Sequence, residues 1–142
     1  YDYILIDCPP SLSLLTVMAL VSSNSLLVPL QTEFFALEGL TQLIKTIDRI
    51  KVNLNPKLQI QGILLTMYDK RNKLSSQVES EARTYFKEKV YQTVIPRNVR
   101  LSEAPSHGVP VLIYDKSCPG SKSYYNFTDE FMTQENKIGS AA

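Results

Sequence analysis

The sequence predicts an α/β fold in which a parallel sheet carries helices on both of its faces. Short apolar runs alternate with longer segments whose apolar residues recur at helical spacing. This alternation is typical of right-handed βαβ crossovers, which build parallel sheets. The chain has 142 residues, enough for one domain with its own core.

The expected strands are four short apolar runs, each bounded by Pro, Asn, Asp or Gly, which seldom continue a strand. They cover residues 3–6, 26–30, 60–65 and 90–94. The first run is followed by Asp7 and then by Pro9 and Pro10. This order predicts a buried strand that ends in a carboxylate at a sharp turn.

The first two expected helices have apolar residues three and four positions apart, as one face of a helix requires. In the first helix these are Leu14, Leu15, Met18 and Val21. In the second they are Leu37, Leu40, Leu43, Ile44, Ile47 and Ile50.

A third helix is expected over 74–89, where Ser76 and Glu79 have the spacing of a capping box. Its expected inner face consists of Val78, Ala82, Tyr85 and Phe86. A fourth helix should begin near Pro119, with one side made of Tyr124, Phe127, Thr128 and Phe131. We expect a single domain over 1–134 and a flexible, polar tail over 135–142.

Composition narrows the class of protein. Hydrophobic residues make up 44% and charged residues 20%, which is near the average of globular domains. No apolar run reaches the ~18 residues that a transmembrane helix needs. The formal net charge is +1, so a nucleic-acid surface would have to come from local clustering of cations. Two distant cysteines and no secretory signal predict a cytoplasmic protein.

Asp7 is the first candidate site residue. In P-loop ATPases an Asp at the carboxyl end of a parallel strand holds magnesium or its bound water. The glycine-rich loop that normally accompanies it, ending in Gly-Lys-Ser or Gly-Lys-Thr, does not occur in this sequence. Two hypotheses follow. Either the chain is a fragment whose loop lies upstream, or Asp7 only caps a turn, as Asp often does.

The polar turns after the expected strands are the other candidate sites, because ligands of such sheets bind at the carboxyl ends of the strands. Arg71 and Arg100 follow two adjacent strand ends, so folding could bring both to one edge of the sheet. Guanidinium groups suit phosphate oxygens. The alternative is a pair of solvated charges or local ion pairs, for example Arg100 with Glu103.

Four sequence blocks, in this order and spacing, resemble the ParA/Soj chromosome-partitioning ATPases. They are Ile-Asp-Cys-Pro-Pro-Ser-Leu at 6–12, Ala-Leu-Glu-Gly-Leu at 36–40, Leu-Leu-Thr-Met-Tyr-Asp at 64–69, and Val-Ile-Pro-Arg-Asn-Val-Arg-Leu-Ser-Glu-Ala-Pro-Ser at 94–106. The similarity extends over about residues 1–132, and the last block is long enough to be specific by itself.

The resemblance implies a P-loop NTPase-like fold whose N-terminal strands are missing here. It also implies an ATPase with a deviant P-loop that uses ATP and magnesium and forms an ATP-dependent homodimer. The dimer would bind DNA without sequence preference, and a ParB-like partner would stimulate hydrolysis. Such a protein would be cytoplasmic and nucleoid-associated, with no membrane partner.

The resemblance also assigns roles to individual residues. Asp7 would be the catalytic Walker B carboxylate, which acts on magnesium through water. The turns at Met67 and at Pro96, Arg97 and Asn98 would wall the adenine. The DNA-contacting arginines would be Arg71 and Arg100, with Lys70, Lys73 and Arg97 as neighbours.

The sequence departs from the family pattern in ways that carry expectations of their own. Because the P-loop is absent, we expect the chain alone to be inactive. The P-loop strand of this fold would lie beside residues 26–30, so the sheet should have a gap or an exposed edge there. Met18 stands where the family usually has Asn, and we expect no loss of function from it.

Two alternative functions remain open from the sequence. The chain could be a non-catalytic module that binds DNA or a protein partner through its arginines and an exposed sheet edge. It could also belong to a MinD-like membrane-cycling ATPase, which needs a basic amphipathic C-terminal helix. Residues 127–137 are too acidic for that helix, so the second alternative is the weaker one.

Overall fold

The computed structural model describes residues 1–9 and 13–139 of the chain, and the side chains of these residues up to 135. Its centre is a three-stranded parallel sheet in the order β1-β2-β3. The strands are β1 (Ser25–Gln31), β2 (Gln59–Tyr68) and β3 (Val90–Pro96). Three of the four expected strands are thereby confirmed.

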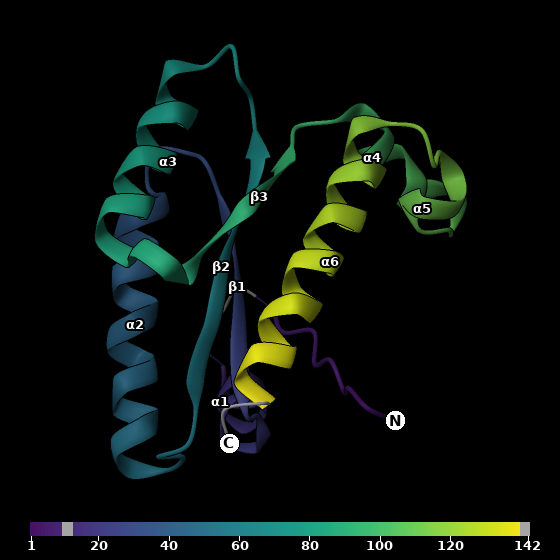
Figure 1. Ribbon diagram of the computed structural model, residues 1–142. Coiled ribbons are helices and arrows are strands. Elements are labelled where there is room, and N and C mark those ends of the chain that lie inside the picture. The colour runs from purple at the N-terminus through teal and green to yellow at the C-terminus, as the bar shows by residue number, and fades with distance from the viewer. Residues whose placement is uncertain (10–12, 140–142) are drawn as a thin grey trace.

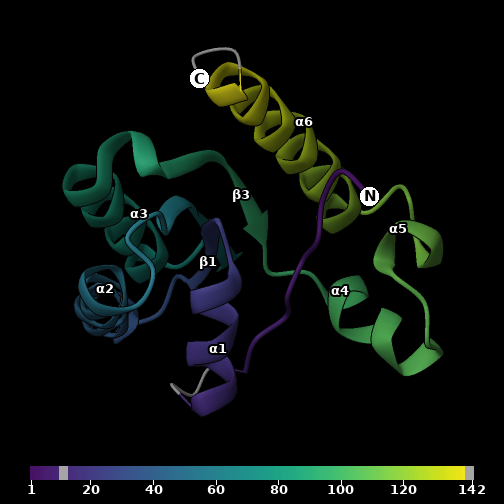
Figure 2. The ribbon, with the colours of Figure 1, turned by 90° about the horizontal axis from the view of Figure 1, so that it is seen from below.

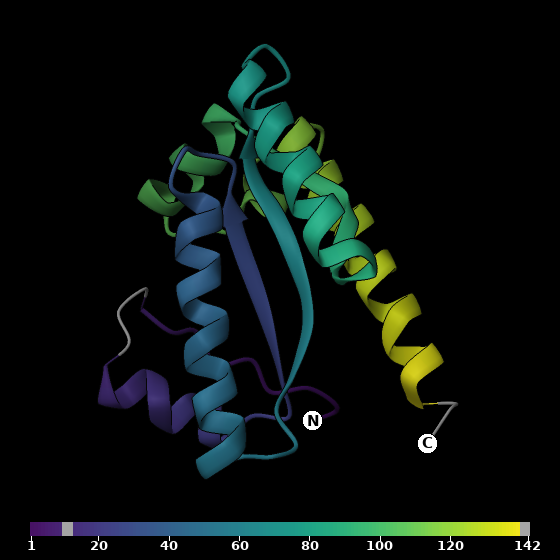
Figure 3. The same cartoon turned by 90° about the vertical axis from the view of Figure 1, so that its left-hand side faces the viewer.

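Helices cover both faces of this sheet, as the sequence predicts. Helices α2 (Ala36–Asn53) and α3 (Lys73–Phe86) lie on one face, and α6 (Pro119–Gly139) crosses the other (Figure 1). Figure 3 shows α2 and α3 side by side in front of the strands. The shorter elements are α1 (Leu14–Ser22), η1 (Lys87–Lys89), α4 (Val99–Glu103), η2 (Ala104–His107) and α5 (Val111–Tyr114).

The middle strand contributes side chains to both layers, because successive residues of a strand point to opposite faces. Ile63 and Leu65 belong to the core that packs against α2 and α3, where Leu40 and Ala82 are also buried. Leu64 faces the opposite layer and packs in a second core formed with β3 and α6. Its members are Tyr91 and Ile95, with Leu27, Leu101, Tyr124, Phe127 and Phe131 partly buried around them.

Three helical faces differ from the sequence prediction. In α1 the predicted residues Leu14, Leu15, Met18 and Val21 are exposed, whereas Thr16 and Leu20 are buried. Tyr85 of α3 is 74% exposed, because its position in the helix turns away from the sheet. Thr128 of α6 is exposed and donates a hydrogen bond to the carbonyl of Tyr124 in its own helix.

The predicted strand over residues 3–6 is wrong. Residues 1–9 have no regular structure and are exposed, and Figure 2 shows them running outside the sheet. A buried strand needs hydrogen bonds from a neighbouring strand, and this segment pairs with none of the described strands. The edge of β1 away from β2 pairs with none of them either, as expected for an incomplete sheet. The turn predicted at Pro10 lies outside the described residues.

The outer edge of β3, in contrast, is covered by two side chains. Glu130 of α6 accepts hydrogen bonds from the backbone N–H groups of Gln92 (2.7 Å) and Thr93 (2.9 Å). Arg83 of α3 donates to the carbonyl oxygens of Tyr91 (3.0 Å) and Gln92 (3.3 Å). These contacts occupy backbone groups that another strand would need, so β3 is built as the end of the sheet.

Helix α6 continues to Gly139 and so extends into the segment 135–142 that the sequence predicts as a tail. The single-domain boundary at 134 and the flexibility of that tail stay predictions.

The predicted capping box at the start of α3 is wrong, because the cap is Asn72. Its side-chain oxygen accepts a hydrogen bond from the N–H of Leu74 at 3.0 Å. We therefore expect Asn72→Ala to lower the free energy of unfolding by about 1 kcal/mol, as loss of an N-cap does. Ser76→Ala is the matched control and should have little effect. Chemical denaturation of both variants checks this, and a larger loss from Ser76→Ala would contradict the assignment.

Candidate functional site

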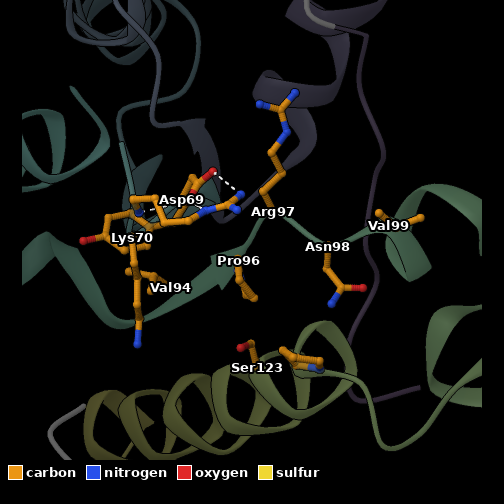
Figure 4. Close-up of a pocket in the computed structure, with 11 residues that line it drawn as sticks. Asp69, Lys70, Val94, Pro96, Arg97, Asn98, Val99 and Ser123 are labelled. Atoms are coloured by element: carbon orange, nitrogen blue, oxygen red, sulfur yellow. Dashed lines mark hydrogen bonds and ion pairs between the residues drawn. The ribbon is translucent and has the colours of Figure 1, made fainter. Parts of the chain in front are cut away.

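A hollow lies at the carboxyl ends of β2 and β3, where the sequence predicts ligand binding (Figure 4). Its volume is about 570 Å³, within the range of small-molecule sites. The walls come from the turn after β2, the turn after β3 and the first part of α6. The lining residues are Tyr68, Asp69, Lys70, Arg71, Val94, Pro96, Arg97, Asn98, Val99, Pro119 and Ser123.

The turn after β2 is organised by the side chain of Asp69. Its Oδ1 accepts a hydrogen bond from the backbone N–H of Arg71 at 3.0 Å. Its backbone carbonyl accepts another from the N–H of Asn72 at 3.0 Å, just before α3 begins. A short polar side chain that bonds the backbone two residues on is a common device for fixing a turn. Lys70 and Arg71 are thereby presented at the edge of the sheet.

The turn after β3 is joined to the first one by the backbone. The N–H of Arg97 donates to the carbonyl of Tyr68 at 2.9 Å. Pro96 closes β3 and gives the hollow a rigid apolar wall. Asn98 is the N-cap of α4, since its Oδ1 accepts from the N–H of Arg100 at 2.9 Å. Of the four residues predicted to wall a base, three line the hollow: Pro96, Arg97 and Asn98.

Met67, the fourth of these residues, does not line the hollow. It has a φ of 54°, in the left-handed region that a non-glycine residue seldom adopts. The Oγ1 of Thr32 lies 3.4 Å from the carbonyl oxygens of both Thr66 and Met67. Thr32 is buried and also bonds Ser75 of α3 at 3.2 Å. This buried polar link holds the end of β2 against the ends of β1 and α3.

Both predicted phosphate-binding arginines are engaged with carboxylates, as the ion-pair alternative anticipated. Arg71 pairs with Asp69 at 3.1 Å, and Arg100 pairs with Glu103 at 2.8 Å and with Asp115 at 3.5 Å. Hydrogen bonds from Arg71 hold the pKa of Asp69 below its usual value, and the nearby charge of Arg97 acts in the same direction.

The other three cations predicted to lie near DNA are Lys70, Lys73 and Arg97, and they occupy different places around the hollow. Lys70 and Arg97 line the hollow, and Figure 4 shows their side chains extending in different directions. Lys73 is the first residue of α3 and does not line it. Arg71 is also in the wall, whereas Arg100 lies beyond it in α4.

The lining of the hollow includes the cations Lys70, Arg71 and Arg97 as well as groups that suit a flat base. The hollow combines an apolar wall at Pro96 and Val94 with polar groups of Asn98 and the turn after β2. Asp7 lies in the exposed segment 1–9, which has no regular structure. Within 1–9 and 13–135, no three His, Cys, Asp or Glu residues are grouped so that they could hold a metal ion.

Sequence reasoning missed the contribution of α6 to the hollow. Pro119 and Ser123 line it although they are far from both turns along the chain. Their place follows from α6 packing across β3, for which the sequence gives no residue-level signal. Val94, the last residue of the predicted strand 90–94, is not predicted as a site residue, whereas Tyr68 lies within the polar turn predicted at the end of the preceding strand.

Comparison with known proteins identifies the family. The chain is 58% identical over 135 residues to the chromosome partitioning protein ParA of Caulobacter vibrioides. The alignment covers 95% of this chain and 51% of the relative. It is 55% identical over 130 residues to the sporulation initiation inhibitor protein Soj of Bacillus subtilis, in an alignment that covers 92% of this chain and 51% of that relative. The chain belongs to the ParA/Soj family. Residues 1–60 also match the family model described as an AAA domain.

This ParA/Soj chain spans about half the length of the curated relatives that it matches. Among solved structures, it is similar to cobyrinic acid a,c-diamide synthase from Mycobacterium smegmatis with bound ATP analog and magnesium. The TM-score is 0.69 at 32% identity, over 87% of this chain and 44% of that protein. The expected P-loop NTPase-like fold is thereby confirmed. No helix in the described part of the chain is long and apolar enough to cross a membrane.

Proposed function

We propose that this chain is the part of a chromosome- or plasmid-partitioning ATPase that carries the base-binding wall and the DNA-facing cations. The observation that supports this most directly is the hollow between the turns after β2 and β3. There the turn at Pro96 to Asn98, from the longest family-like block, lies against the turn that presents Arg71. The complete protein would bind ATP and magnesium, dimerise and bind DNA without sequence preference.

The adenine is assigned to the hollow. Pro96 offers an apolar surface to one part of the ring, and the polar atoms of Asn98 and the neighbouring backbone are available to its edge. The backbone hydrogen bond from the N–H of Arg97 to the carbonyl of Tyr68 keeps the two turns at a fixed separation. Met67 would contribute indirectly, because its left-handed backbone sets the direction of the chain at the end of β2.

Hydrolysis is assigned to the complete protein and not to these 142 residues alone. Magnesium would supply charge stabilisation for phosphoryl transfer once bound. The proposed role of Asp7, contact with magnesium through water, requires the segment 1–9 to join a sheet. A neighbouring strand from a further part of the protein, placed on the unpaired edge of β1, would provide that sheet. We accordingly expect no ATPase activity from the isolated chain.

DNA is assigned to the surface at the carboxyl ends of β2 and β3. Its cations are Lys70, Arg71, Lys73, Arg97 and Arg100. Such contacts reach phosphate oxygens and carry no sequence information. Binding should therefore be similar on unrelated duplexes and should weaken steeply with salt. A ParB-like partner would stimulate hydrolysis and release the DNA. The complete protein would act in the cytoplasm, associated with the nucleoid and not with a membrane.

A comparison of the complete protein with the chain tests this function. Fluorescence anisotropy with a labelled duplex would measure DNA affinity with and without ATP and magnesium. We expect ATP to tighten DNA binding by the complete protein and to leave the chain unaffected. If the complete protein neither bound ATP nor gained DNA affinity from it, the ATPase assignment would be wrong.

One alternative is supported by a specific observation. Within the described residues no three His, Cys, Asp or Glu side chains are grouped to hold a metal ion, which favours a non-catalytic binding module for the chain by itself. That module would bind DNA in a salt-sensitive manner and would not respond to ATP. The same anisotropy experiment separates the two functions, because the module predicts no ATP response from the complete protein either.

A further inference from the structure

Two of the arginines assigned to DNA, Arg71 and Arg100, have their guanidinium groups paired with carboxylates of the same chain. Arg71 is 90% exposed in its side chain and would otherwise be free to contact a ligand. Its Nε donates to Oδ1 of Asp69 at 3.1 Å, and its Nη2 donates to Oδ2 at 3.1 Å. This two-point contact uses the same pair of N–H groups that would grip two phosphate oxygens.

The carboxylate of Asp69 is not a mobile partner that happens to lie near the arginine. Its Oδ1 is already fixed by the backbone N–H of Arg71, and its side chain is only 24% exposed. The same bond organises the turn, so the turn itself holds the carboxylate beside the arginine. A phosphate that approaches this arginine therefore competes with a carboxylate that the turn holds beside it.

Arg100 is also paired with carboxylates, but with two of them, Glu103 and Asp115. Its Nη1 donates to Oε2 of Glu103 at 2.8 Å, and its Nε lies 3.5 Å from Oδ2 of Asp115. The hydroxyl of Tyr114 donates to that Oε2 at 3.3 Å. Asp115 is fixed in turn, because its Oδ1 accepts from the backbone N–H groups of Ser117 and Cys118.

We propose that Asp69, Glu103 and Asp115 compete with DNA phosphates for Arg71 and Arg100, and thereby set the strength of non-specific DNA binding. This inference rests on the proposed DNA-binding function. Solvent-exposed ion pairs are weak, so phosphate can displace the carboxylates. Loss of one pair should consequently tighten DNA binding by at most about fivefold. The result is a surface that binds DNA weakly enough for release.

The decisive experiment is a double-mutant cycle on Asp69 and Arg71, measured in the complete protein with ATP by anisotropy of a labelled duplex of arbitrary sequence. Asp69→Asn removes the charge and keeps an oxygen that can accept from the N–H of Arg71. We expect Asp69→Asn to tighten DNA binding when Arg71 is present and to have a clearly smaller effect in the Arg71→Ala background, where only the neighbouring charge of Arg97 remains. Asp48→Asn, an exposed position on α2, is the control with the same change of charge.

An equal gain in both backgrounds would overturn the inference, because the effect would then be one of bulk charge. So would an unchanged affinity on Asp69→Asn while Arg71→Ala weakens binding. If Arg71→Ala itself changes nothing, the assignment of DNA to this arginine fails, and the inference fails with it. Glu103→Gln, measured with and without Arg100→Ala, repeats the cycle at a site outside the turn and should give the same pattern.

Discussion

Replacing both Arg71 and Arg100 by alanine is expected to weaken DNA binding on every duplex tested and to flatten its dependence on salt. Each arginine is assigned one phosphate contact, and each contact contributes about 0.9 to the slope of log affinity against log salt concentration. The magnitude of that slope should therefore be smaller by about 1.8 in the double variant than in the parent protein. Titrations of one duplex at several salt concentrations measure it directly.

The matched control removes two lysines from the opposite end of the molecule. Lys51 is in the last turn of α2 and Lys57 lies in the turn before β2, so both are remote from the carboxyl ends of the strands. The variant with Lys51→Ala and Lys57→Ala has the same net charge as the double arginine variant. Equal losses of affinity and slope in the two variants would show that overall charge, and not the assigned surface, binds the DNA.

The variant Gly62→Ala is expected to be the most destabilising single methyl insertion in the sheet. A Cβ at this buried position of β2 would overlap Cε2 of Tyr91 and lie 2.8 Å from its Cζ. The Tyr91 ring is 1% exposed and packs edge-on against Phe127 of α6 with ring centroids 4.9 Å apart, so it has no room to withdraw. We expect a loss of about 1–3 kcal/mol in the free energy of unfolding, the range of overpacked cores.

Gly39→Ala provides the control for that experiment. Gly39 lies within α2, and a Cβ there would meet nothing within 4 Å. Alanine in a helix is favoured over glycine by about 0.8–1 kcal/mol, so this variant should be more stable than the parent. Urea denaturation followed by circular dichroism compares the two. A Gly62→Ala variant as stable as the parent would contradict the packing described between β2, β3 and α6.

The sequence predicts the fold well where local pattern and tertiary contacts agree. The strands 26–30, 60–65 and 90–94 have apolar residues on both faces and are found between helices that bury them. Residues 3–6 have the same pattern but no partner among the described strands, and they remain exposed. A strand depends on its neighbours for hydrogen bonds, so its own composition is insufficient.

The candidate site is predictable to a similar extent. Sequence order places Arg71 after one expected strand and Pro96, Arg97 and Asn98 after the next, and the parallel sheet brings them to one hollow. The carboxylate partners are harder to foresee. Glu103 is three residues from Arg100 and was named as an alternative partner, whereas Asp115 reaches the same arginine only through the fold of α4 and α5. Long-range contacts of this kind leave no local pattern in the sequence.

The measurement that tests the central claim most directly is photolabelling of the complete protein with 8-azido-ATP, followed by peptide mapping. The azide is on the base, so the label reports which residues surround the adenine. We expect the label in peptides that contain residues 68–71 or 94–99, and we expect excess ATP to prevent it. Labelling confined to the groove between α2 and α3, at Leu37, Tyr85 and Phe86, would contradict the assignment of the base to the carboxyl ends of β2 and β3.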